Sequence, residues 1–539
     1  MSLDRVPRHR RGLKRRRSLL VLPLLSLLVS ISSVAQALNI DLSFTGSSLL
    51  TSGFIPPDTM GAAGPDHFVE LLNGQYAVYR TSDGVRVQTS TLNDFWRNAG
   101  VTPAGSFAFD PRVTFDASSG RWFAASADNA GGPNNFLVAV SNSSDPTKGW
   151  RGFAVPSASG GTRWADFPTL GVNRDGVYVA ANMFPITAPG VTTSILVLPK
   201  ADLLAGTVAR RTLFENVDPG SIGFSVQPVT DPKSTGTPVA SLLSDFNTGA
   251  GLFKRSNITG SVTSPVLDTT DKFIAVPPFA APPNAPQPGP KAPLESGDTR
   301  FSSSVVASNG TLWGVQTVDS GGRDALRWFQ IDAATNTLRQ SGLIASRDLS
   351  FYYGSIAVND FGTVVIGFSG SGPSQFVSAY AVEGQTKNGA TTFGDPLLLK
   401  AGVSDYEVTF GAGSNRWGDY SATMLDPDDP LRFWTIQEWV SGTDIWSTQI
   451  TELNVVPGPT TLFLIGTTAA GLGLARWWQR RAASEVARLS PGLFSGTEVL
   501  SRGGPFTSRG AGARMCPCRP RSRCDGSGRR SARRSAEST

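Results

Sequence analysis

"SIAVNDFGTVVIGFS", residues 355–369, places two short apolar runs on either side of a polar turn, Asn359-Asp360-Phe361-Gly362. Asn, Asp and Gly tolerate a positive φ, and the β-branched residues around the turn suit the pleated backbone of a strand. The stretch therefore predicts a β-hairpin with two apolar strands. Strands that are apolar along their whole length are buried on both faces of the sheet, which is typical of a small sheet packed between two others.

Six other segments repeat this order of apolar strand, polar turn and apolar strand, and "RVTFDASSGRWFAAS" at 112–126 and "TLGVNRDGVYVAAN" at 169–182 are the clearest. A third strand-like run follows most of these pairs, as in "NNFLVAVSNSSDP" at 134–146, and a fourth follows in some units. The repeat length is about 61 residues. The predicted second strands begin near Phe68, Trp122, Val177, Val239, Leu312, Val364 and Phe433.

Seven units of about four strands predict an all-β fold, a seven-bladed β-propeller spanning residues 38–454. "ALNIDLSFTG", residues 37–46, lies before the first unit and alternates in polarity, so we expect it to complete the last blade and close the ring. Two β-sandwich domains are the alternative, because they also contain many short strands joined by turns. The proline-rich stretch at 276–293 predicts a stiff, exposed arm between units four and five.

Both ends of the chain are predicted to carry targeting signals. Residues 1–37 combine a basic stretch, a leucine-rich run and Ala35-Gln36-Ala37, which predicts a secretory signal peptide cleaved after Ala37. A second apolar segment at 455–481 is long enough to cross a thin bilayer as a transmembrane helix, with its arginines on the cytoplasmic side.

This second segment resembles the PEP-CTERM sorting signal of Gram-negative bacteria, which has a proline motif, a short membrane span and a terminal basic cluster. The matching residues are Val456, Pro457, Pro459, Arg476, Arg480 and Arg481. The resemblance implies an exosortase-type sorting enzyme as partner, a transient anchor in the inner membrane, and delivery to the cell envelope, outer surface or extracellular matrix. Two departures are a glycine, Gly458, where the signal usually has glutamate, and the 58 residues after Arg481. We expect this Arg-rich tail, 482–539, to be disordered.

The charge of the chain is unevenly distributed. The sequence pI of about 9.3 invites a nucleic-acid partner, but residues 38–475 carry 26 Lys and Arg against 37 Asp and Glu. The basic excess belongs to the two ends, so no nucleic-acid partner is expected for the body of the protein.

The body also lacks the residues of several reaction classes. Its one histidine is His67, and all three cysteines lie in the tail. Cysteine nucleophiles and Cys/His metal clusters are therefore excluded from the body, and a Ser-His-Asp arrangement would depend on His67 alone.

Aspartates occur just before the first strand of several units. Because the first strand of a propeller blade is innermost, these carboxylates are expected to form a ring at one mouth of the central channel, able to hold a Ca2+-like cation or bind sugar hydroxyls. In the alternative, each aspartate only caps its own turn. The expected ring is Asp58, Asp110, Asp166, Asp298 and Asp419, with Arg112, Arg300, Arg416 and Tyr420 as nearby ligand contacts.

The stretches at 110–126, 166–184 and 415–439 resemble the broad set of secreted bacterial propellers of the sialidase-like kind. That resemblance implies a glycan-related function, and Arg112, Arg327, Arg416 and Tyr420 can be fitted to a sialidase-like site. The Asp-box S-x-D-x-G-x-T-W of sialidases is missing, however. We therefore expect a non-enzymatic surface or matrix protein that binds exopolysaccharide, envelope glycan or protein. The alternatives are a glycosidase or polysaccharide lyase, and a purely structural surface protein.

Overall fold

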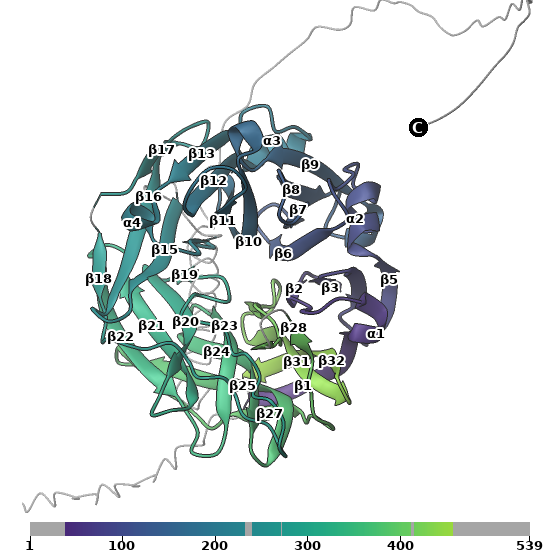
Figure 1. Cartoon of the computed structure of the whole chain (residues 1–539), viewed down its shortest axis with the longest axis vertical. Helices are drawn as coiled ribbons and strands as arrows, with labels where there is room; N and C mark the ends of the chain where they lie inside the picture. The colour runs from purple at the N-terminus through teal and green to yellow at the C-terminus, as the bar shows by residue number, and fades with distance from the viewer. Residues whose placement is uncertain (1–37, 232–239, 271, 411–413, 456–539) are drawn as a thin grey trace, which may run out of the picture. The chain divides into compact units, whose positions relative to one another are not determined.

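The computed structural model describes residues 38–231, 240–270, 272–410 and 414–455. These residues form seven small antiparallel sheets around a central channel (Figure 1). The seven-bladed β-propeller is confirmed, and the alternative of two β-sandwich domains is wrong.

The first four blades follow the repeat in chain order. Blade 1 contains β2 (Met60–Ala63), β3 (His67–Leu72), β4 (Gln75–Arg80) and β5 (Arg86–Ser90). Blade 2 contains β6 (Ala108–Asp116), β7 (Arg121–Asp128), β8 (Asn135–Ser141) and β9 (Trp150–Pro156). Blade 3 contains β10 (Arg163–Val172), β11 (Gly176–Pro185), β12 (Thr192–Pro199) and β13 (Thr212–Val217). Blade 4 contains β14 (Gln227–Pro228), β15 (Ala240–Asn247), β16 (Leu252–Ser261), β17 (Ser264–Asp268) and β18 (Phe273–Ala275).

The last three blades include the strand that closes the ring. Blade 5 contains β19 (Val306–Ser308), β20 (Thr311–Asp319), β21 (Asp324–Asp332) and β22 (Thr337–Ile344). Blade 6 contains β23 (Ser350–Val358), β24 (Thr363–Gly372), β25 (Gln375–Lys387), β26 (Ala390–Phe393) and β27 (Leu397–Lys400). Blade 7 contains β30 (Ala422–Leu425), β31 (Arg432–Gly442), β32 (Ile445–Val455) and β1 (Leu38–Ser48). The seven second strands begin within one residue of the predicted positions.

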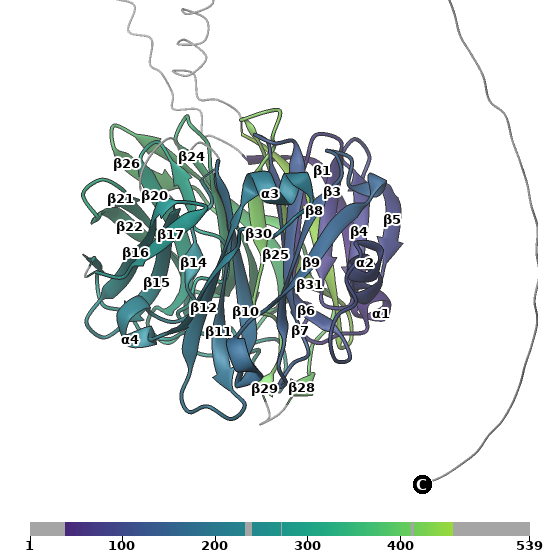
Figure 2. The same cartoon turned by 90° about the horizontal axis from the view of Figure 1, so that it is seen from above.

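Short helices and one hairpin decorate the ring. The helices are α1 (Leu49–Ser52), α2 (Leu92–Asn98), α3 (Lys200–Ala205) and α4 (Pro219–Ile222), with 3-10 turns at Pro146–Lys148 and Ser159–Gly161. The hairpin pairs β28 (Thr409–Phe410) with β29 (Ser414–Asn415). Figure 2 shows α1, α4 and this hairpin at the same end of the ring.

Strand β1 closes the ring as the sequence predicted. It pairs antiparallel with β32, from Leu38 opposite Val455 to Ser48 opposite Ser447. The buried carboxylate of Glu70, in β3, links β1 to blade 1, because it accepts a 2.6 Å hydrogen bond from the Ser47 hydroxyl. Blade 7 is thus built from both ends of the propeller domain.

Neighbouring blades pack through apolar faces on both sides of each sheet. The rings of Phe68 in blade 1 and Trp434 in blade 7 lie 5.7 Å apart. Between blades 1 and 2, a side chain at Gly64 would put its Cβ 2.4 Å from the Trp122 ring, so only glycine fits there. This two-sided burial is the physical reason that the second strands are apolar along their length.

The proline-rich stretch is docked on the ring, which differs from the exposed spacer that we expected. Ala285 and Leu294 are fully buried and exchange two backbone hydrogen bonds of 2.8 Å. The amide of Gln287 donates to the Tyr406 carbonyl at 2.7 Å and accepts from the Tyr406 N–H at 2.9 Å. Proline removes backbone donors but keeps its carbonyl acceptors, as when Pro286 accepts from the Ser371 hydroxyl at 2.8 Å.

The two predicted targeting segments lie outside the described residues. The signal peptide at 1–37, the sorting segment from Val456 onward and the tail at 482–539 belong to this part of the chain. Among the described residues, none of the helices has the length and apolar character needed to span a bilayer. Val455, which the sequence analysis assigned to the sorting segment, ends β32.

Candidate functional site

The innermost strands begin at one end of the channel, and several share an unusual backbone there. Residues with φ of +48° to +53° interrupt or precede five inner strands, and the pairing register shifts at this point in β6, β10 and β23. Aspartate tolerates this left-handed conformation better than most residues, which accounts for two of the five positions. The five residues are Asp58, Asp110, Phe167, Ser225 and Tyr353.

The structure brings most of the predicted aspartate ring together. The backbone N–H of Asp419 donates to Asp58 Oδ1 at 3.1 Å, and the N–H of Phe167 donates to Asp110 Oδ2 at 2.9 Å. Asp166 precedes Phe167 and lies close enough to Asp110 and Asp419 to interact electrostatically with both. We call this end of the channel, with Asp58, Asp110, Asp166 and Asp419, the acidic mouth. Asp58 and Asp110 therefore accept backbone hydrogen bonds from other blades, whereas the alternative had each aspartate capping its own turn.

Burial and mutual repulsion raise the pKa values of these carboxyl groups. Burial, and then Asp419 and Asp110, hold the pKa of Asp58 well above its usual range. The pKa of Asp110 is raised mainly by burial and by Asp419. Burial and the neighbouring Asp110 and Asp419 raise the pKa of Asp166 to about 8. With a pKa of about 8, the Asp166 carboxyl group retains its proton at neutral pH.

The three predicted arginines have different roles. Arg416 pairs with Asp419 at 2.7 Å, and Arg300 pairs with Asp298 at 2.7 Å, so each arginine has a carboxylate partner. The guanidinium of Arg112 instead stacks 3.5 Å from the Tyr420 ring centre. Both members of this last pair are buried, with exposed fractions of 2% and 1%. Arg112 and Tyr420 are therefore placed to support the mouth from within.

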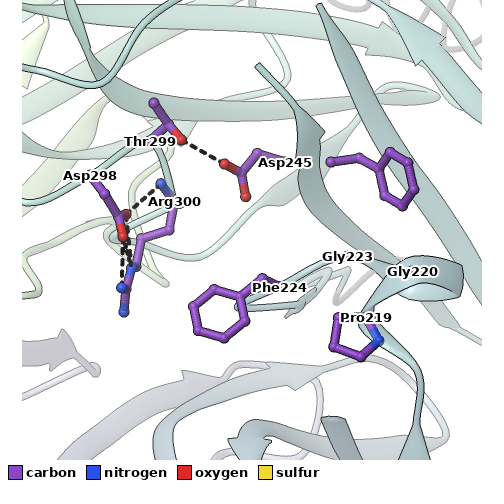
Figure 3. A pocket seen from close by; sticks show the side chains of 9 residues that line it. Pro219, Gly220, Gly223, Phe224, Asp245, Asp298, Thr299 and Arg300 are labelled. Carbon is purple, nitrogen blue, oxygen red and sulfur yellow. Dashed lines mark hydrogen bonds and ion pairs between the residues drawn. The ribbon is translucent and has the colours of Figure 1, made fainter. Parts of the chain in front are cut away.

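A pocket of about 410 Å³ lies beside the acidic mouth (Figure 3). Helix α4, the end of β15 and the segment before β19 form its walls. Gly223 has a φ of +89°, and a Cβ at this position would lie 2.0 Å from the Ser244 hydroxyl, so glycine is required. The lining residues are Pro219, Gly220, Gly223, Phe224, Asp245, Phe246, Asp298, Thr299 and Arg300.

Charged and aromatic groups alternate around this pocket. Asp245 Oδ2 accepts a 2.7 Å hydrogen bond from the Thr299 hydroxyl, and burial raises the pKa of Asp245. The Arg300 guanidinium lies 4.6 Å from the Phe167 ring centre and 5.5 Å from that of Phe224. Through Phe167, Arg300 connects the pocket to the acidic mouth.

Sequence reasoning placed two of the pocket residues, Asp298 and Arg300, near the mouth but missed the others. Phe224, Asp245 and Phe246 belong to the fourth unit, whose repeat pattern is the weakest in the chain. Conversely, Asp298 does not join the cluster of the acidic mouth, because it lies in the docked segment before β19 and pairs with Arg300. The one available signal was the acidic end of the second strand in "SLLSDF", residues 241–246.

A second cavity of about 580 Å³ occupies the channel itself. Its walls come from the inner strands β2, β6, β19, β23 and β30, and include Val113, Ile356 and Met424. The carboxylate of Asp426, where β30 ends, lines it as well. The channel is thus mostly apolar beyond the acidic mouth.

Within residues 38–455, apart from the gaps given above, no three His, Cys, Asp or Glu side chains are arranged to hold a metal ion. The expected Ca2+-like cation therefore has no set of carboxylate ligands in this part of the chain. His67 begins β3, after β2 has run away from the acidic mouth, and so lies at the far end of blade 1 from Asp58.

Neither a protein-family model nor a curated protein matches the sequence. Similar solved structures include the Dos1 propeller, with 11% identity, a TM-score of 0.35, and coverage of 77% of this chain and 95% of that one. A Trypanosoma rangeli sialidase has 11% identity and a TM-score of 0.30, with 78% of this chain and 62% of that chain covered. A Pyrococcus horikoshii acylaminoacyl peptidase has 8% identity and a TM-score of 0.33, with 71% and 49% covered.

Proposed function

We propose that this protein is an exported propeller that binds a glycan in the pocket beside the acidic mouth. The observation that carries the proposal is the lining of that pocket, where the rings of Phe224 and Phe246 lie beside the polar groups of Asp245, Asp298 and Arg300. Sugars present apolar C–H faces to aromatic rings and hydroxyl groups to carboxylates and guanidinium groups. The pocket offers both kinds of contact within a volume suited to a small ligand.

The burial and the hydrogen bonding of Asp58 and Asp110 favour binding without turnover. Asp58 and Asp110 accept backbone hydrogen bonds and are buried, with exposed fractions of 2% and 7%. A general acid or base must reach the substrate, whereas these two carboxyl groups are held inside the protein. They serve to shape the mouth.

A glycosidase or lyase is the second candidate, and one residue favours it. Asp166 is only partly buried, and its pKa of about 8 keeps it protonated at neutral pH. A protonated carboxyl group at a binding mouth is the form that a general acid requires.

Export rests on the sequence alone. The signal-like segment at 1–37 and the resemblance of residues 456–481 to PEP-CTERM support secretion, exosortase-type processing and display on the envelope or in the matrix. The intact mass of the secreted protein tests this, because it reports both processed ends. A mass equal to that of the whole 539-residue chain would contradict it.

A polysaccharide panel separates the binder from the enzyme. We expect the purified protein to retain a glycan without releasing products, and Phe224→Ala to weaken retention at least 10-fold. Phe361→Ala is the matched control, because Phe361 is 49% exposed in the turn between β23 and β24. Product release that Asp166→Asn abolishes would establish the enzyme instead. Equal retention by wild type and Phe224→Ala would contradict the proposed pocket.

A further inference from the structure

The pocket has more negative than positive charge available to a ligand. Of its two carboxylates, Asp298 is already paired with Arg300, the one cationic side chain among the lining residues. Asp245 makes no ion pair with any described Lys or Arg, and its hydrogen bond comes from the neutral Thr299 hydroxyl. A ligand that enters the pocket therefore meets one carboxylate that lacks a cationic partner.

Two aromatic residues share the pocket with this carboxylate. Phe224, which Figure 3 labels, and Phe246 line the same pocket as Asp245. The face of an aromatic ring attracts cations, and the Arg300 guanidinium already lies within 5.5 Å of the Phe224 ring centre. A pocket lined by both a carboxylate and aromatic residues can recognise an ammonium group.

We propose that the pocket selects a sugar carrying a protonated primary amine, whose ammonium group donates a hydrogen bond to Asp245. The proposal rests on the proposed function and specifies the chemical class of the glycan. Thr299 holds the carboxylate in place, and Phe224 and Phe246 contact the sugar ring and the ammonium group.

The surrounding charge opposes an acidic sugar. Residues 38–475 have an excess of 11 acidic residues, and the pocket adjoins the acidic mouth. A uronate or sialate group would lie beside Asp245 with no free guanidinium to pair with, because Arg300 is engaged by Asp298. Ligand charge is therefore expected to determine selectivity.

Isothermal titration of the full chain tests this with four oligosaccharides of equal length, built from glucosamine, N-acetylglucosamine, glucose or glucuronic acid. We expect the glucosamine oligomer to bind at least 10-fold more tightly than the glucose oligomer, and added salt to reduce this preference. Asp245→Asn should remove the preference while binding of the glucose oligomer persists. Asp175→Asn, in the turn between β10 and β11 at the opposite end of blade 3, is the matched control and should retain it.

The outcomes distinguish the two proposals. Equal affinity for the glucosamine and glucose oligomers, or tightest binding of the glucuronic acid oligomer, overturns amine selectivity and leaves glycan binding intact. A preference that survives in Asp245→Asn also overturns it. If Asp245→Asn does not fold, the salt dependence of the wild-type protein decides, because amine selectivity without salt dependence contradicts an ionic contact. Failure of all four oligosaccharides to bind contradicts both proposals.

Discussion

Asp58 and Asp110 occupy equivalent positions before and within the inner strands of blades 1 and 2, with φ of 48° and 51°, and one side chain connects them. The Asn73 amide nitrogen donates to Asp58 Oδ2 at 2.6 Å, and the Asn73 amide oxygen accepts from the Asp110 N–H at 2.8 Å. The acidic mouth is therefore a bonded assembly that spans two blades.

Replacing this connector should destabilise the protein. Asn73→Ala removes one hydrogen bond from the buried Asp58 carboxyl group, at Oδ2, and one from the buried Asp110 N–H, which costs about 1–3 kcal/mol for each group. We expect a loss of this order in the free energy of unfolding, measured by urea denaturation. Asn142→Ala, which removes one exposed hydrogen bond to Lys148, should cost less. Equal losses would show that Asn73 does not connect the blades.

The raised pKa of Asp166 predicts a pH dependence of stability. Because the pKa of Asp166 is about 8 in the folded protein and near 3.8 when unfolded, the native state binds the extra proton between these values. Its contribution to the free energy of unfolding should therefore fall as the pH rises from about 4 to 8. Asp166→Asn should reduce this slope and stabilise the protein at pH 8 by ~1–3 kcal/mol. Identical slopes in thermal unfolding across this range would refute the shift.

The stacked pair of Arg112 and Tyr420 should depend on the planar guanidinium group. Arg112 also donates from Nε to the Pro168 carbonyl at 2.8 Å, a bond that lysine cannot reproduce in the same geometry. We expect Arg112→Lys to lower the free energy of unfolding by ~2–4 kcal/mol. Arg174→Lys, at an exposed ion pair with Asp175, should have almost no effect. A neutral result for Arg112→Lys would mean that charge alone suffices.

The pairing of β1 with β32, which closes the ring, can be tested by local hydrogen exchange. Glu70 accepts hydrogen bonds from the hydroxyl groups of Ser47, Tyr79 and Thr448, so Glu70→Gln replaces a charged acceptor by an amide that must donate as well. We expect faster amide hydrogen exchange in β1 while exchange in β23, in blade 6, stays unchanged. Uniformly faster exchange in both strands would indicate general destabilisation.

Local chemistry made the blades predictable. Turns such as Asn359–Gly362 and the apolar strands beside them recur from unit to unit, so second strands could be placed to within one residue. The repeat also indicated which aspartates would meet, since Asp58 and Asp110 fall at the same step of consecutive units. In these segments the local sequence pattern and the propeller fold favour the same structure.

Tertiary contacts made the pocket unpredictable. Asp298 and Arg300 follow the proline-rich stretch and line the pocket, and distant groups such as Ser371 and Tyr406 bond to that stretch. Asp245 gains its role from Thr299, 54 residues further along the chain. Nothing in the spacing of these residues indicates that they meet.

The pairing of Leu38 with Val455 also determines how the domain responds to mechanical load. Strand β32 lies between β31 and β1, so a pull on Val455 along the strand must shear two rows of backbone hydrogen bonds together. Shear distributes force over many bonds, whereas peeling would break them one at a time. A propeller tethered at this residue would thus be held by a strand that is hydrogen-bonded along both edges.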